Sequence, residues 1–224
     1  MRKYYKFKMN MTIANLLSIL FLVISILPAS KMISKFFDNG SIKDVALFFI
    51  IYVFWMFLHE ILHGIGHMLC GVKSKDLSFG ASIEKGVLFC LVRKEVNKKD
   101  ILISLLFPFF FIGVVTYIIA IIINSPLLFI LSCFNISGAC VDILMFANFI
   151  RLDKDITYIE PSDGTSFYIM SNKPINKLTG LIKVGEGEYK EGMFEGNYKK
   201  YDISKISYIF FGISIIAAII LLFL

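Results

Sequence analysis

Five apolar stretches, each about long enough to cross a lipid bilayer, divide the sequence. They cover residues 12–29, 45–70, 101–123, 126–149 and 206–224. A membrane-spanning helix needs roughly 17–25 such residues. Hydrophobic residues make up 57% of the chain, against about 45–50% in soluble globular domains. The sequence therefore predicts a mostly α-helical membrane bundle of about five transmembrane helices. We expect the first to be an uncleaved signal anchor, because its apolar core is longer than that of a cleavable signal peptide.

The number of lysine and arginine residues differs between the loops that join these stretches, and loops with many alternate with loops with few. Four precede the first stretch, three follow it, seven lie between the second and third, none lies in the next turn, and nine lie between the fourth and fifth. The positive-inside rule then predicts a multi-pass protein of the cell membrane with its N-terminus in the cytosol. Because the basic residues are spread over loops in this way, the net charge of +6 gives no indication of a nucleic-acid partner.

Two segments outside the apolar stretches have strand-like patterns. In residues 72–100, "LSFGASI" and "VLFCLV" flank the turn "EKG", which predicts a β-hairpin after the second helix. In residues 151–205, "ITYIE" and "SFYIM" flank "PSDG", which predicts a small β-rich cytosolic insert. The expected domains are a membrane core over 1–150, this insert over 151–205, and a C-terminal transmembrane helix over 206–224.

All three histidines of the chain lie in "FLHEILHGIGH", residues 57–67, within the second apolar stretch. His59, Glu60 and His63 form H-E-x-x-H. Positions four apart share one face of a helix, so both imidazoles can bind one Zn²⁺, with Glu60 beside them as the base for the zinc-activated water. A glutamate in a membrane helix costs about 2.5–3.5 kcal/mol, which favours a metal site over a structural polar cluster. His67 lies about 12 Å along the axis from His59, so we interpret it as an interfacial or supporting residue.

A catalytic zinc site usually has three protein ligands and a water, so one ligand is still missing. The apolar cores of the first, third and fifth stretches contain no ionisable residue, whereas the fourth contains Asp142. At about 1.5 Å per residue, His63 and Asp142 lie at nearly the same depth, about 12–13 Å inside the predicted cytosolic boundary. We therefore predict Asp142 as the third metal ligand. The alternative is an isolated aspartate that is hydrogen-bonded within the bundle. Asn135 is expected either to orient substrate or to bond across helices.

The order of these features resembles a known family. H-E-x-x-H-G in an early span, a β-hairpin, a span containing Pro108 and an Asn/Gly-rich span ending in aspartate look like the predicted membrane zincin peptidases, a family of unknown function. That family is similar to the site-2 protease group of intramembrane metalloproteases. The resemblance covers residues 45–170, including "DGTSFYIM" at 163–170.

The resemblance implies that His59 and His63 are metal ligands, Glu60 the base and Asp142 the third ligand. The Asn-x-x-Pro…Leu-Asp-Gly pattern of the site-2 group is not present, because no proline lies near Asn135 and the aspartate is flanked by valine and isoleucine. The transfer of a role to Asp142 is therefore weaker than the transfer to the two histidines.

The leading hypothesis is a membrane-embedded zinc metalloendopeptidase that hydrolyses membrane or membrane-proximal polypeptides from a site open to the cytosol. The hairpin is expected either to present an edge strand to an extended substrate or to act as a structural cover. The alternative is a non-catalytic membrane protein, such as an assembly or immunity factor, with a structural zinc site. A metal transporter is disfavoured, because three of the five stretches have no ionisable residues to line a path.

Overall fold

The structure, a computed structural model, describes residues 1–39, 42–82, 87–160 and 166–194. The predicted fifth apolar helix over 206–224 lies outside the described residues, and so do the predicted turns "EKG" and "PSDG". The expected total of about five transmembrane helices therefore stays a prediction.

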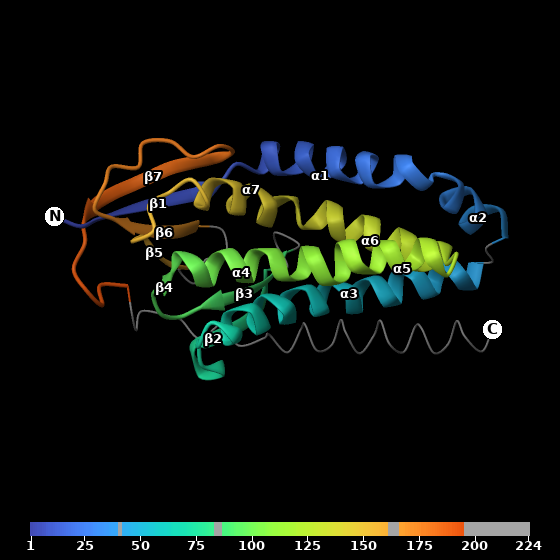
Figure 1. Cartoon of the computed structure of the whole chain (residues 1–224), viewed down its shortest axis with the longest axis horizontal. Coiled ribbons are helices and arrows are strands. Elements are labelled where there is room, and N and C mark those ends of the chain that lie inside the picture. Colours follow the sequence, from blue (N-terminus) through green and yellow to red (C-terminus); the bar gives the residue numbers. More distant parts are fainter. Residues whose placement is uncertain (40–41, 83–86, 161–165, 195–224) are drawn as a thin grey trace.

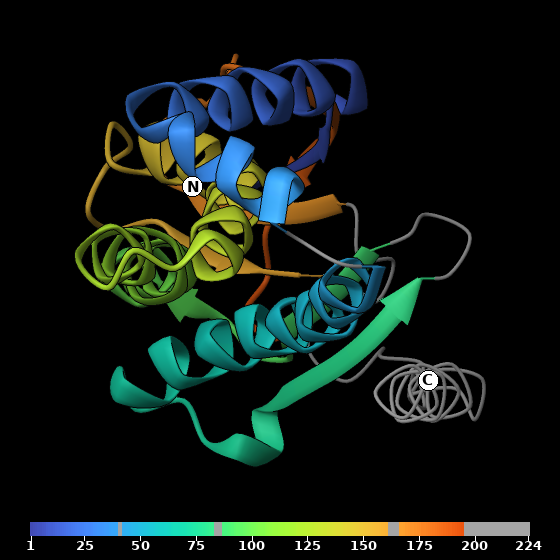
Figure 2. The same ribbon diagram turned by 90° about the vertical axis from the view of Figure 1, so that its right-hand side faces the viewer.

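Among the described residues, three helical runs are long and apolar enough to cross a membrane, namely Met11–Ala29, Lys43–Leu69 and Lys98–Ile122. A pair of helices, α6 (Pro126–Gly138) and α7 (Cys140–Phe149), passes the same test together but is bent by 43°. These runs coincide with the first four predicted stretches. Figure 1 shows them lying side by side along the long axis of the molecule, and Figure 2 shows α1 and α3 on opposite sides of the bundle.

The runs differ in regularity. The first joins α1 (Met11–Ile26) to a 3-10 turn, η1 (Leu27–Ala29), and is followed by α2 (Lys31–Asn39). The second is the single helix α3 (Ile42–Leu69). The third passes from α4 (Lys98–Pro108) through a π-helical segment, η4 (Phe109–Val115), into α5 (Thr116–Ile122). Proline inside a helix and π-helical turns are common causes of local irregularity, and here the two are adjacent.

A five-stranded antiparallel sheet closes one end of the bundle (Figure 1). Its order is β4-β5-β6-β1-β7. The strands are β1 (Lys3–Met9), β4 (Val96–Asn97), β5 (Thr157–Ile159), β6 (Ser166–Ser171) and β7 (Leu181–Glu188). The predicted pairing of "ITYIE" with "SFYIM" is confirmed, since β5 and β6 are antiparallel with Tyr158 opposite Ile169.

The position of β1 was not predicted, because the N-terminus was interpreted only as a basic flank. The strand lies between β6 and β7 and pairs with both. A signal was present in the sequence: Tyr5 and Phe7 alternate with lysines and are buried, at 3% and 0% exposure, and a period of two is typical of a strand. The predicted insert thus shares its sheet with the N-terminus, while the predicted domain boundaries stay a prediction.

Asparagine caps connect the sheet directly to the helices. Asn10, just after β1, accepts hydrogen bonds from two amides in the first turn of α1. Asn97, the last residue of β4, accepts one from the amide of Asp100 in α4. These amides have no partner within their own helix. Each helix therefore begins where its strand ends, which places the sheet at the helix termini.

The predicted hairpin after the second helix is confirmed as β2 (Leu77–Ser82) paired antiparallel with β3 (Val87–Val92), after a 3-10 turn, η2 (Ser74–Asp76). It packs along α3. Gly64 permits this approach, because a Cβ atom there would lie 2.8 Å from Cζ of Phe79. The hairpin therefore fills the space beside Gly64.

Candidate metal centre

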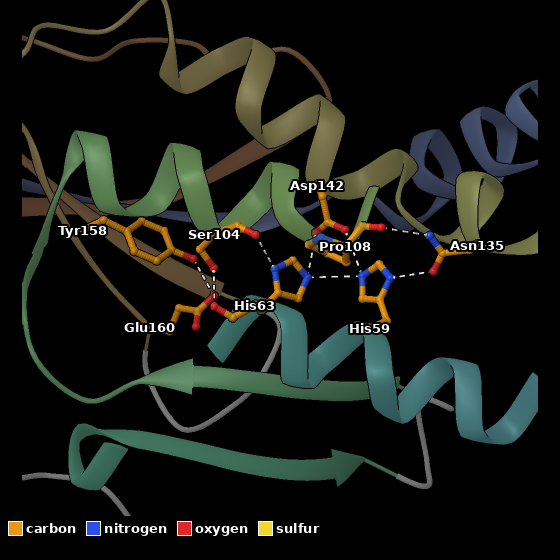
Figure 3. A network of polar contacts seen from close by, with 8 residues as sticks. All are labelled: His59, His63, Ser104, Pro108, Asn135, Asp142, Tyr158 and Glu160. Atoms are coloured by element: carbon orange, nitrogen blue, oxygen red, sulfur yellow. Dashed lines mark hydrogen bonds and ion pairs between the residues drawn. The ribbon is translucent and has the colours of Figure 1, made fainter. Parts of the chain in front are cut away.

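His59 and His63 lie one turn apart on α3 and turn their Nε2 atoms toward each other, at 3.2 Å. Asp142, near the start of α7, faces the same point from across the bundle (Figure 3). One of its carboxylate oxygens is 3.1 Å from Nε2 of His59, and the other is 3.6 Å from Nε2 of His63. The structure therefore brings together the three side chains that the sequence predicted as metal ligands.

Partners on neighbouring helices orient both imidazole rings. Nδ1 of His63 lies 2.9 Å from the backbone carbonyl oxygen of Ser104. A carbonyl only accepts, so this nitrogen donates. Nδ1 of His59 lies 3.0 Å from Oδ1 of Asn135, whose Nδ2 donates to the carbonyl of Pro108 at 3.3 Å. Because the carbonyl of Pro108 can only accept, the side-chain atom of Asn135 that faces it is the nitrogen, and the atom that faces His59 is the oxygen. Nδ1 of His59 therefore also donates.

It follows that each neutral ring presents a lone pair on Nε2 to the point that Asp142 also faces. The two Nε2 atoms and the two oxygens of the Asp142 carboxylate then converge, at separations of 3.1–3.6 Å, which is unfavourable unless a cation or additional protons lie between them. Two ligands at about 2.0–2.2 Å from a tetrahedral zinc ion are separated by about 3.3 Å. The separations and the donor chemistry of the three side chains therefore fit zinc.

Pro108 explains why the Ser104 carbonyl is available. In a regular helix this carbonyl accepts from the amide four residues later, and at that position the proline has no hydrogen to donate. The hydroxyl of Ser104 also donates to the backbone carbonyl of His63 at 3.0 Å. Gly66 allows the two helices to lie this close, because a Cβ atom there would be 2.7 Å from Cα of Ser104.

Glu60 lies beside this cluster. One of its carboxylate oxygens is within 4.8 Å of the ligand nitrogens of both His59 and His63. The backbone amide of Cys90 in β3 forms a hydrogen bond with this carboxylate. Glu60 is thus held by the hairpin next to the candidate metal ligands, at a position suited to exchange a proton with a water between them.

A cavity of about 340 Å³ opens on this cluster. Its wall includes His67, which is 2% exposed and whose Nδ1 has no hydrogen-bond partner among the described residues. His67 does not join the cluster of His59, Glu60 and His63, which agrees with its predicted distance. Asn135 bonds across helices, which was one of the two interpretations of that residue.

The sequence analysis did not identify Glu160 or its partner Tyr158 as residues of the site, because only the apolar stretches were searched for acids. Glu160, after β5, lines the cavity, and Tyr158 donates a hydrogen bond to it at 2.5 Å (Figure 3). Burial raises the pKa of Glu160 to about 7. The apolar strand β5, which directly precedes Glu160, could have indicated this position. A strand that packs against the bundle also places the residue after it close to the bundle.

Residues 52–157 match the sequence model of the family described as "Putative zincin peptidase". The predicted resemblance to this family is therefore confirmed over that segment. The segment runs from α3 through the hairpin and Asp142 to β5, and so includes the whole cluster described above. No curated protein and no solved structure matches the chain.

Proposed function

We propose that this protein is a membrane-embedded zinc metallopeptidase in which His59, His63 and Asp142 hold the metal. The observation that carries the proposal is the convergence of two Nε2 lone pairs and a carboxylate within 3.1–3.6 Å. The match of residues 52–157 to the zincin peptidase family supports the same chemistry. Asn135 and the Ser104 carbonyl set the orientation of the two rings, as groups behind metal-binding histidines commonly do.

Zinc held by these residues would supply a Lewis acid that polarises a peptide carbonyl and makes a water acidic. Glu60 takes a proton from the water as the water oxygen bonds to the carbonyl carbon, and then delivers this proton to the amine nitrogen as the carbon–nitrogen bond breaks. The amide of Cys90 keeps the Glu60 carboxylate facing the reaction. A purely structural zinc site would not need an acid beside its ligands, and this distinguishes the peptidase from the non-catalytic alternative.

The surface of the helices supports placement in a bilayer. Large apolar side chains point outward along the long helices, including Leu16, Phe49 and Phe110, which are 62%, 61% and 52% exposed. Such a continuous apolar exterior is unfavourable in water and suits lipid. The sheet unites strands from the N-terminus, from the loop after the hairpin and from the segment after α7. These are basic regions of the chain, so the sheet end faces the cytosol under the positive-inside rule.

Among the described residues no strand pairs with the edge of β3 that lies away from β2, and this edge offers a place for an extended substrate, with the amides of Cys90 and Val92 already bonded to Glu60 and Glu160. Alternate residues of an antiparallel strand turn their backbone groups toward the partner strand. The amide of Arg93 bonds to the carbonyl of Asp76 on the β2 side, so the even-numbered residues Leu88, Cys90 and Val92 face α3 and the metal cluster. A polypeptide that pairs with this edge would pass Glu60 and the metal.

Metal analysis and a cleavage assay on the full chain test this proposal. We expect about one zinc per chain in the wild type, and loss of zinc in His59→Ala and His63→Ala. Glu60→Gln should keep its zinc and lose cleavage, because it removes the base and not a ligand. A folded wild type without zinc would contradict the metal site, and an active Glu60→Gln variant would contradict the mechanism.

A further inference from the structure

Two cavities meet at the metal centre. The first has a volume of about 340 Å³ and the second about 180 Å³. His59, Glu60, Leu88 and Gly138 line both of them. A polypeptide lying across the reactive atoms would therefore place residues from one side of the cleaved bond in the first cavity and residues from the other side in the second.

The second cavity is apolar and largely aromatic. Away from the shared residues it is lined by Tyr52, Trp55, Met56, Phe134 and Asn135. The first four come from the middle of α3 and from α6, which are parts of the apolar helical runs. Burial of an apolar side chain of the size of leucine or phenylalanine is favourable here. This cavity suits the apolar part of a membrane-spanning segment.

The first cavity extends in the opposite direction, toward the sheet, and its wall at that end includes polar side chains. Tyr158, Glu160, Ser166 and Phe167 line it at that end. The carboxylate of Glu160 stands on the far side of His63 from His59 (Figure 3). The described lining residues of this cavity include no lysine and no arginine.

Glu160 is held in place. Tyr158 donates to its Oε1, and the backbone amide of Val92 in β3 also forms a hydrogen bond with the carboxylate. Tyr158 itself is 1% exposed and packs edge-on against Phe149, with ring centroids 5.4 Å apart. A carboxylate supported in this way is a fixed feature of the cavity wall and cannot swing out to solvent without breaking buried contacts.

Among the described residues that line this cavity, no lysine or arginine serves as a counterion for Glu160. In the proposed enzyme, the two positive charges of zinc are matched by Asp142 and Glu60. Glu160 adds a further negative charge to a partly dry cavity, where an unpaired carboxylate is costly. A lysine or arginine of the substrate would neutralise it, and such an ion pair is stronger in this cavity than on an open surface.

We infer that the substrate is a polypeptide whose apolar stretch is followed or preceded by a basic residue, with the apolar side bound at Trp55 and the basic side at Glu160. This inference rests on the proposed function and adds a substrate class to it. Membrane segments have this sequence pattern at their cytosolic ends, where lysine and arginine flank the apolar span. Cleavage would then occur where such a segment leaves the bilayer on the side of the sheet.

Synthetic peptides and the zinc-loaded full chain in detergent test this inference. One set carries a single lysine at successive positions on either side of a leucine- and valine-rich stretch, and a matched set carries norleucine instead. We expect kcat/KM to be about tenfold higher for the best lysine peptide than for its norleucine partner. Glu160→Gln should reduce this ratio to about one, because glutamine keeps an oxygen for Tyr158 but loses the charge.

Asp153→Asn is the matched control. Asp153 pairs with Lys173 at 2.9 Å and does not line the cavity, so the same loss of charge there should leave the tenfold ratio in place. Binding gives a readout that does not need turnover. Trp55 is the only tryptophan of the chain, and its emission should change when a peptide fills the apolar cavity of the Glu60→Gln variant, at a lower concentration for lysine than for norleucine peptides.

The outcomes separate the two proposals. Equal cleavage of lysine and norleucine peptides by the wild type, or a preference that survives in Glu160→Gln, overturns the inference and leaves the peptidase standing. A zinc-loaded wild type that cleaves no peptide, while no peptide alters Trp55 emission in Glu60→Gln, overturns both. Binding that prefers lysine in Glu60→Gln and loses this preference in the double variant with Glu160→Gln supports the inference.

Discussion

The imidazole of His63 donates a hydrogen bond through Nδ1 to the backbone carbonyl of Ser104, at 2.9 Å. The carbonyl is free to accept because Pro108, four residues later in α4, has no amide hydrogen. An irregularity in one helix thus determines the orientation of a candidate metal ligand on another. Loss of such supporting groups typically lowers metal affinity by about 10–100-fold.

The first prediction concerns Pro108→Ala. Alanine restores an amide hydrogen that competes for the Ser104 carbonyl, so His63 loses part of its orientation. We expect zinc affinity to fall by about 10–100-fold, measured by titration against a chromogenic chelator. Pro126→Ala, at the first turn of α6, makes the same change at a distance and should leave affinity unaltered. Equal affinities in Pro108→Ala and the wild type would show that the freed carbonyl is unimportant.

The second prediction concerns Asp142→Asn. The proposed loss of a ligand should weaken zinc binding by more than the roughly 100-fold that supporting groups contribute, and should abolish cleavage. In the metal-free protein the variant should be at least as stable as the wild type, because an asparagine nitrogen can donate to Nε2 of His59. Thermal unfolding with and without zinc measures both effects, since a ligand stabilises only the state that binds it. A melting temperature that rises with zinc equally in both proteins would rule out Asp142 as a ligand.

The third prediction concerns topology. Met9 of β1 pairs with Leu181 of β7, so we expect the N-terminus and the segment around Lys177 to lie on one side of the bilayer. The basic residues predict that this is the cytosolic side. Single cysteines at Lys73 and Lys177 should react with a membrane-impermeant reagent only after cells are opened. A cysteine at Asn124, in the turn before α6, should react in intact cells. A reactive Lys177→Cys in intact cells would contradict this orientation.

The fourth prediction concerns the pH dependence of stability in the metal-free protein. Burial raises the pKa of Glu160 from an ordinary 4.5 to about 7. Between these values the folded chain keeps a proton that the unfolded chain has lost, so stability decreases as pH rises from about 4.5 to about 7. The groups that face this carboxyl are Tyr158, His63, Glu60 and the amide of Val92.

Glu160→Gln does not titrate, so it should lack this contribution. The melting temperature of the wild type minus that of the variant should therefore fall between pH 5 and pH 7 and then level off. Contributions of His63 and Glu60 are common to both proteins and largely cancel in this difference. A flat difference over the whole range would show that the Glu160 carboxyl titrates normally.

Local pattern was sufficient for much of this protein. Apolar length predicted the helical runs, and β-like runs around turns predicted both hairpins, because each depends on residues close together in the chain. The spacing of His59 and His63 placed them on one face of one helix. Asp142 could be proposed by elimination, because ionisable residues are rare in apolar helices.

Only the tertiary structure decided how those parts meet. Whether Nδ1 of His59 donates depends on Asn135, which is 76 residues away, and β1 joins a sheet with strands more than 150 residues later. Glu160 gained its relation to the metal centre only because β5 packs against the helix ends. Contacts between such distant segments depend on how helices, hairpin and sheet pack against one another, and no local period in the sequence records that packing.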